Sequence, residues 1–329
     1  MALGTAAVAR AQGGDAALFE AIRAADMVLA TTGFELSTAN APLCDRLEPG
    51  LGIQLHTLAQ YDVKVRESVR GHFRFAGSVA VEGVVPGSPA AAAGVRQDDT
   101  VVSIGGLVPA EPPSGAEPTA QLASYVAAIA LLPSDQPVKL VLSRAGARIE
   151  LTVRPVPACR SRYELRIANM FDTRANGEMV QITSKYIDEY GVERVRGVVA
   201  HELAHNILRH RERLAAAGLS FGIASGFGRN VGYFRQAEIQ ADILSAHLLV
   251  RAGYDANAAA QFWRDAGPAL LGLKIRSRSH PAFKDRAATI EAEAVRIAAS
   301  GGVATPPAFL ADRDKPLDGK WQPLLVRAR

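Results

Sequence analysis

Groups able to bind a metal ion are concentrated in VVAHELAHNILRH, residues 198–210. His201 and His205 are four positions apart, so in a helix their imidazoles project from one face. This spacing suits one tetrahedral Zn²⁺, and Glu202, beside the first histidine, can reach a water bound to the metal. The flanking residues are apolar, which predicts a buried helix, and buried histidines and glutamates need partners. The H-E-x-x-H pattern therefore indicates a zinc site with a general base next to it.

A catalytic zinc usually takes three protein ligands and leaves a fourth position for water. The segment AEIQADILSAHLL places Glu238 on a second helix, where its carboxylate could complete the set. Asp242 lies one turn later and could accept a hydrogen bond from a ligand imidazole, which would fix its tautomer. The alternative is that both are ordinary solvated acids, but their apolar surroundings favour the ligand and supporting roles.

A third polar group occurs in SHPAFKDR. His280 precedes a proline, so its backbone is held out of the helix that begins after it. This histidine could stabilise an oxyanion or occupy the open position of the zinc, and the alternative is a loop histidine without a role. The remaining histidines, which we interpret as surface or core residues, are His56, His72, His210 and His247.

The rest of the chain must position these groups. Residues 50–155 alternate short β-type runs with Gly and Pro, interrupted by one helix at 119–132. The apolar pattern of residues 15–31 predicts a helix before this region. Beyond residue 160 the sequence predicts mostly helices, with a short strand at 178–183. The helices predicted in that second part are 192–215, 234–252, 256–266 and 281–299.

The totals of the sequence narrow the class of protein. Its 329 residues, 48% of them apolar, suffice for two domain cores. The net charge is only +4 and the basic residues are scattered, which argues against a nucleic-acid partner. We expect no membrane-spanning helix, because no apolar run approaches the ~18 residues required. The start, MALGTAAVARAQ, is similar to the tail of a secretory signal, and a disordered N-terminus is the alternative.

The sequence contains two cysteines, Cys44 and Cys159, far apart in the chain. In a cytosolic protein they would be inert core thiols. In an exported protein they become candidates for a disulfide that closes a long loop.

Three motifs in this order, HELAHNILRH, EIQAD and HPAFKDR, resemble the HtpX and CAAX-prenyl-protease family of zinc metallopeptidases, the minigluzincins, and most closely its soluble cell-envelope branch. The resemblance covers roughly 160–300 and implies one Zn²⁺ per chain. The residues so implied are His201, His205 and Glu238 as ligands, Glu202 as catalytic acid and base, Asp242 in support, and His280 with Arg286 near the transition state or the zinc.

The sequence also departs from this family. Family members often carry NAF and Gly-Leu-Leu around the short strand, where this chain has NMF and SKYI. The departure concerns substrate preference and not the zinc chemistry. The strand at 178–183 is still expected to be the edge along which substrate pairs.

The first half resembles a PDZ domain of the bacterial protease type, through EPGLGIQL and VVPGSPAAAAGVRQDDTVVSIGGL. Gly50, Leu51, Gly52 and Ile53 would supply backbone N–H groups for a C-terminal carboxylate. A peptide would then lie between 53–55 and the helix at 119–132, unless the groove is blocked. A disulfide between the two cysteines would join the ends of this domain at the root of the peptidase domain.

The resemblances imply an α+β fold, with a PDZ-type, β-barrel-like domain before a mostly helical, zincin-like peptidase domain with a short edge strand. The predicted segments are a signal remnant or disordered start (1–14), a helix packing on the peptidase domain (15–47), the PDZ domain (48–156), the peptidase domain (157–302) and an extended tail (303–329).

The expected function is a zinc metalloendopeptidase of the bacterial periplasm or cell envelope, acting on misfolded or envelope proteins and associating with membranes at most peripherally. Its PDZ domain would select substrates through their C-terminal peptides or regulate the enzyme. One alternative is a PDZ-bearing binding or chaperone-like protein whose metal site is latent or structural. The intact Glu202 favours the enzyme, because structural zinc sites are usually rich in cysteine. A metal-dependent hydrolase of other substrates has little support.

Overall fold

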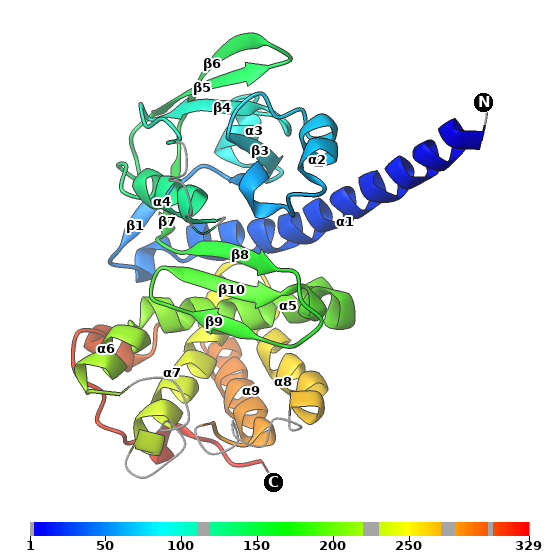
Figure 1. Ribbon diagram of the computed structural model, residues 1–329. Helices are drawn as coiled ribbons and strands as arrows, with labels where there is room; N and C mark the ends of the chain where they lie inside the picture. Colours follow the sequence, from blue (N-terminus) through cyan, green and yellow to red (C-terminus); the bar gives the residue numbers. More distant parts are fainter. Residues whose placement is uncertain are drawn as a thin grey trace. The chain divides into compact units, whose positions relative to one another are not determined.

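The computed structural model describes residues 3–110, 117, 119–219, 230–270, 280–301 and 305–328. The chain divides into two compact units. Unit 1 comprises Met1–Phe34 and Arg46–Arg160, and unit 2 comprises Glu35–Asp45 and Ser161–Arg329. Unit 1 holds most of the strands and unit 2 most of the helices, as Figure 1 shows, so the expected α+β class is confirmed.

Unit 1 is built on a five-stranded antiparallel sheet in which sequential strands are neighbours. Its strands are β2 (Ile53–Thr57), β3 (Val79–Val84), β4 (Thr100–Ile104), β5 (Val138–Arg144) and β6 (Ala147–Val153). Apolar side chains alternate along β5, so that Val138, Leu140 and Leu142 enter one core. Helices α3 (Pro89–Ala92) and α4 (Ala120–Ile129) contribute to the same core.

This sheet is open, with β2 and β6 at its two edges. The barrel-like form that we expected is therefore wrong for the described residues, which contain no closed barrel. The reason is the strictly sequential strand order, which pairs β2 with β3 and leaves β6 paired with β5 alone.

The N-terminal helix α1 (Leu3–Ala39) is longer than the sequence predicted. Phe19 shares a core with Val69 and Phe73, which belong to α2 (Arg66–His72) and its C-terminal end. The helix is part of unit 1 up to Phe34 and of unit 2 from Glu35, where Ser37 Oγ lies 2.6 Å from Tyr163 Oη; packing of the whole segment 15–47 on the peptidase domain stays a prediction. The aromatic cluster of unit 1 supplies the apolar surface that this helix covers.

Strands β1 (Leu47–Gly50) and β7 (Val156–Cys159) form a separate antiparallel pair that joins the two ends of the segment 46–160. Cys44 and Cys159 are both disulfide-bonded, which confirms the bridge considered from the sequence.

Unit 2 contains a three-stranded sheet in the order β8-β10-β9. Its strands are β8 (Arg162–Arg166), β9 (Thr173–Ala175) and β10 (Met179–Thr183). Strand β10 is parallel to β8 and antiparallel to β9, so it lies in the centre of the sheet. Our expectation of an edge strand at 178–183 is wrong, because the hairpin at Gly177 (φ 96°) folds β9 back onto it.

In its described residues, unit 2 also contains the helices α5 (Ser184–Ile207), α6 (His210–Ala216), α7 (Asn230–Arg251), α8 (Ala258–Leu270) and α9 (Phe283–Ala299). Helix α5 contacts β9 and β10 on one side and α7 and α8 on the other, and α9 packs on α7 and α8 (Figure 1). Gly197 permits close packing of α5 on α8, since a Cβ there would lie 2.7 Å from the backbone of Ala259. Helix α5 is thus central to this unit.

Shorter elements are η1 (Ala41–Leu43), η2 (Leu58–Gln60), η4 (Ala308–Asp312) and η5 (Gln322–Leu324). In the described part of the chain, no helix is both long and apolar enough to cross a bilayer. The stretch GLSFGIASGFGRNVGYF after α6 is rich in glycine, which predicts a flap or a loop near the site, and most of it lies outside the described residues.

Candidate active site

Two helices bring together the three side chains predicted to bind zinc. His201 and His205 of α5 direct their Nε2 atoms toward each other, 3.0 Å apart. Glu238 of α7 places Oε2 3.5 Å from Nε2 of His201 and Oε1 3.7 Å from Nε2 of His205. In the described ranges, these three residues form a group whose ligand atoms all lie within 4.8 Å of one another.

The spacing of these atoms fits a zinc ion. Two ligands bound at about 2.1 Å with tetrahedral angles would be roughly 3.4 Å apart. The three observed separations, 3.0, 3.5 and 3.7 Å, bracket that value. Two imidazole nitrogens and one carboxylate are also the donor set found in catalytic zinc sites with an open fourth position. The residues present therefore fit zinc.

Asp242 fixes the orientation of His201, the first of the predicted metal ligands. Its side chain is fully buried, and its Oδ1 accepts a hydrogen bond from Nδ1 of His201 at 3.0 Å. Arg286 donates to the same carboxylate at 2.7 and 2.8 Å, and Trp263 donates through Nε1 at 3.1 Å. Because Nδ1 of His201 donates to Asp242, Nε2 is the nitrogen that would remain for a metal; Arg286 Nη2 also lies 3.2 Å from it.

The pKa values of the two histidines predicted as ligands are shifted in opposite directions. Burial alone would lower the pKa of His201, but hydrogen bonds to Asp242 and Glu238 raise it to about 9. Burial, with the charge of His201, holds the pKa of His205 well below its usual range. Metal binding would therefore displace a proton from His201, while His205 offers a neutral imidazole.

Glu202 lies beside the ligands as a buried carboxyl, 8% exposed. Burial raises its pKa above the ordinary value, and the charge of His201 and a hydrogen bond from Thr173 of β9 only partly offset that effect. A raised carboxyl pKa brings a general base closer to neutrality, where proton transfer in both directions is efficient.

The carboxylate of Glu238 also contacts Arg286 and His280. Arg286, which is 1% exposed, approaches Oε2 at 3.1 Å and stacks on the ring of Trp263. His280 approaches Oε1 through Nε2 at 3.4 Å and is more exposed. Burial alone would raise the pKa of Glu238, but the charges of His280 and Arg286 hold it well below its usual range. The structure thus brings both residues to the ligand carboxylate, and their roles in catalysis stay predictions.

Sequence reasoning missed three residues of this site. Trp263 supports Asp242, and Thr173 contacts the predicted base. His210, which we interpreted as an ordinary surface or core residue, is 1% exposed and places Nδ1 2.9 Å from Nδ1 of His205. Burial lowers the pKa of His210 to about 3, so its imidazole is neutral. The available signal was a third histidine five positions after the second.

The predicted peptide-binding residues of unit 1 lie between β1 and β2. Gly50 ends β1, and Leu51, Gly52 and Ile53 lead into β2. Gly52 has a φ of 75°, and its carbonyl accepts a hydrogen bond from Ser88 Oγ at 3.4 Å. A side chain at position 52 would collide with Ser88. These contacts explain the glycine and leave peptide binding a prediction.

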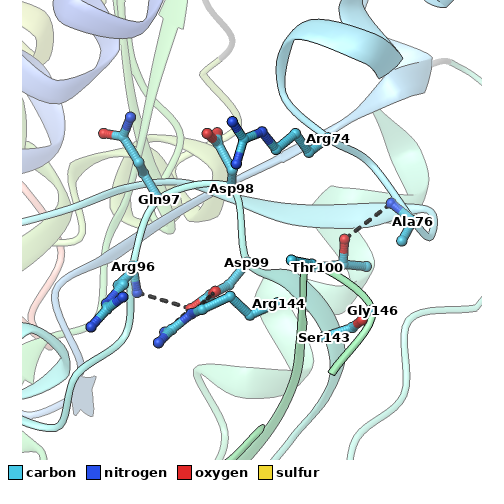
Figure 2. Close-up of a pocket in the computed structure, with 11 residues that line it drawn as sticks. Arg74, Ala76, Arg96, Gln97, Asp98, Asp99, Thr100, Ser143, Arg144 and Gly146 are labelled. Atoms are coloured by element: carbon cyan, nitrogen blue, oxygen red, sulfur yellow. Dashed lines mark hydrogen bonds and ion pairs between the residues drawn. The ribbon is translucent and has the colours of Figure 1, made fainter. Parts of the chain in front are cut away.

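Figure 2 shows a surface pocket of unit 1, about 230 Å³ in volume. Its two acids already have cationic partners. Asp99 accepts hydrogen bonds from Arg144 Nε and Nη2 at 2.7 Å each, and Asp98 pairs with Arg23. The carboxylates of this pocket are therefore neutralised by guanidinium groups, and no histidine is among the described residues that line the pocket.

Comparisons with known proteins bear on the second unit. Residues 221–294 match the model of Peptidase family M48, a span that holds Glu238, Asp242, His280 and Arg286. The chain is also 29% identical over 188 residues to the mitochondrial metalloendopeptidase OMA1 of Schizosaccharomyces pombe, covering 49% of this chain and 54% of the relative. The chain thus spans about half the length of this curated relative. Together with the helical unit that carries the site, the two matches support a metallopeptidase of the M48 family.

Proposed function

We propose that the protein is a zinc-dependent endopeptidase. The observation that carries the proposal is the convergence of two imidazole Nε2 atoms and one carboxylate at tetrahedral spacing, with the buried carboxyl of Glu202 beside them. The matches to Peptidase family M48 and to a metalloendopeptidase support the same reaction class.

His201, His205 and Glu238 would hold the zinc, which when bound would supply Lewis-acid activation of the attacking water and of the scissile carbonyl. Glu202 removes a proton from the attacking water and delivers it to the amine nitrogen of the leaving group. Asp242 keeps the ring of His201 oriented. His280, whose Nε2 lies 3.4 Å from Oε1 of Glu238, is proposed to stabilise the oxyanion that develops on the carbonyl.

Among the described residues β9 pairs with β10 alone, and we propose its other edge as the place where an extended substrate binds. Asn176 N–H donates to Met179 O, and Thr183 N–H donates to Asp172 O. In an antiparallel pair, residues that bond to the neighbouring strand alternate with residues that do not. Thr173 follows the bonded residue Asp172, so its backbone N–H and C=O point away from β10. A peptide paired with this edge would pass the base, because Thr173 also contacts Glu202.

Unit 1 is proposed to act as a PDZ-like domain that selects substrates or regulates the peptidase. Partly buried Ile53 of β2 and Leu122 and Val126 of α4 pack against the same core and would line a groove for a C-terminal peptide. Backbone N–H groups of 50–53 would meet the carboxylate. We further propose the bacterial periplasm or cell envelope as the location, since a disulfide persists in oxidising compartments. Misfolded or envelope proteins are the proposed substrates.

The test of the peptidase is a casein digestion with wild-type protein, with and without a chelator, beside Glu202→Gln. We expect one zinc per chain in both proteins and a loss of cleavage of about 10²- to 10⁴-fold in the variant. Glu212→Gln, which changes an exposed acid of α6, is the matched control and should cleave normally. Cleavage retained by Glu202→Gln would contradict the assignment of the base.

The alternative function, a binding protein with a latent or structural metal site, predicts zinc without cleavage in the wild-type protein. Peptide binding distinguishes the role of unit 1. Fluorescence anisotropy should detect peptides with a free C-terminal carboxylate, and amidation of that terminus should abolish the signal. Equal binding of the amidated peptide would contradict the PDZ-like role.

A further inference from the structure

The second ligand histidine has a partner that no motif predicted. Nδ1 of His205 lies 2.9 Å from Nδ1 of His210, and Nε2 of His210 lies 3.1 Å from Oε1 of Gln240. Both partners are buried, at 1% and 3% exposure. These contacts form a chain of three side chains that begins on the face of His205 opposite the group made with His201 and Glu238.

The direction of this chain follows from the chemistry of its end. The amide oxygen of Gln240 only accepts hydrogen bonds, so Nε2 of His210 carries the hydrogen. One hydrogen lies between the two Nδ1 atoms at 2.9 Å, and a zinc ion on Nε2 of His205 would require that this hydrogen belong to Nδ1 of His205, so that Nδ1 of His210 accepts it. Nδ1 of His205 must therefore donate, and the lone pair of His205 is left on Nε2, where it faces the predicted zinc position.

A break in the helix puts His210 in this place. In one continuous helix a residue five positions on would lie about 140° around the axis from His205. Instead Arg209 adopts a left-handed conformation (φ 53°, ψ 36°), and α6 begins at the next residue. The strained residue is held by ion pairs with Asp45 and Asp314. A left-handed conformation is strained for a residue other than glycine, and such strain is often found at functional sites.

We propose that His210 is a positioning residue that fixes the tautomer and ring orientation of the ligand His205. The inference rests on the proposed function, because it concerns a ligand of the predicted zinc. It gives the two ligand histidines different supports: His201 donates to the carboxylate of Asp242, whereas His205 donates to a neutral imidazole. The neutral acceptor orients the ring without adding a further negative charge beside the metal.

Two substitutions at one position separate positioning from packing. In His210→Asn the amide oxygen replaces Nδ1 as an acceptor, whereas His210→Leu leaves the Nδ1–H of His205 without one. Both lose the bond to Gln240, so both lose part of the packing. We expect zinc affinity, measured by competition with a chromogenic chelator, to fall 10- to 100-fold in the leucine variant and about 3-fold or less in the asparagine variant. The control is His247→Leu, which removes another fully buried histidine, bonded to Glu293, and should leave zinc affinity unchanged.

A spectroscopic readout reports the tautomer directly. Long-range ¹H–¹⁵N correlation spectra of the histidine rings should show His205 protonated at Nδ1 in the zinc-loaded wild-type and asparagine proteins. Should the leucine variant fail to fold, Gln240→Leu replaces it, and a several-fold weaker zinc affinity is expected there because the tautomer of His210 is no longer fixed.

Equal zinc affinity of the wild-type and leucine proteins, or of the wild-type and Gln240→Leu proteins where the first does not fold, would overturn this inference alone. A wild-type protein that binds no zinc would instead overturn the proposed function and the inference with it. The two failures are thus distinguishable in one titration.

Discussion

Asp242→Asn tests the buried network behind the first zinc ligand. The carboxylate is fully buried and accepts hydrogen bonds from Arg286, Trp263 and His201. An asparagine at this position keeps one acceptor oxygen and adds an NH₂ group. Whichever way the amide is oriented, that group faces a donor, because all three partners donate. The substitution therefore removes a counter-charge and loses at least one strong hydrogen bond.

The magnitude follows from the burial of the cation. Removing one partner of a buried ion pair costs about 3–5 kcal/mol, because the remaining charge is left without compensation. Arg286 keeps one other carboxylate, Glu238 at 3.1 Å, so the lower end of that range applies. A loss of ~3 kcal/mol is large against the ~5–15 kcal/mol that stabilise a typical fold. With a urea dependence of about 2 kcal/mol per molar, the unfolding midpoint should fall by ~1.5 M. Zinc affinity should fall about 10- to 100-fold as His201 loses its orientation.

Tryptophan fluorescence during urea unfolding is the assay. The chain contains two tryptophans, Trp263 and Trp321, and both belong to unit 2, so the signal reports on the unit that holds the site. Asp265→Asn is the matched control, because it breaks a solvent-exposed pair with Arg194 at 2.7 Å and should cost ~1 kcal/mol or less. A midpoint of Asp242→Asn within 0.3 M, on the order of the error of such extrapolations, of the wild type would refute the reasoning.

Three further predictions concern other parts of the chain. Replacing Cys44 and Cys159 by serine should lower the free energy of unfolding by ~2–5 kcal/mol in calorimetry, because the bridge closes a long loop; equal stability would contradict this. Burial and a neighbouring carboxylate raise the pKa of Glu82 in the folded protein. Protonated Glu82 therefore contributes fully to the free energy of unfolding below its unfolded pKa of ~4.5, and this contribution is lost as the pH rises through its folded pKa. The melting temperature of Glu82→Gln should therefore exceed that of the wild type at pH 8 and equal it at pH 4. The same difference in melting temperature at both pH values would refute this explanation. Gly197→Ala should cost ~1–3 kcal/mol by forcing α5 from α8, as urea unfolding measures; an unchanged unfolding midpoint would contradict the close packing at this position.

Local periodicity explains what could be predicted of the site from the sequence. The spacing of His201 and His205 places both on one face of any helix, whatever its surroundings. Glu238 and Asp242 stood out because acids in an apolar helix need partners. Such arguments use residues within a turn or two of one another, and the distances between these side chains agree with them.

Features set by distant contacts could not be predicted in the same way. The central place of β10 depends on β9, a strand of three residues whose sequence, Thr-Arg-Ala, carries little β signal. The packing of α1 depends on an apolar cluster around Phe73, which cannot be inferred from the sequence of the helix alone. The position of His210 depends on a left-handed Arg209, whose ion-pair partners lie more than 100 residues away in sequence.

The left-handed turn at Arg209 has a consequence for protein engineering. Since each residue of a helix advances about 100° around its axis, inserting or deleting one residue near this turn would swing the third imidazole of HELAHNILRH away while leaving H-E-x-x-H intact. A chimera joined at this point would keep every side chain of the H-E-x-x-H motif and still lose the contact between His210 and His205. Grafts of this centre onto other scaffolds should therefore extend through the first turn of α6.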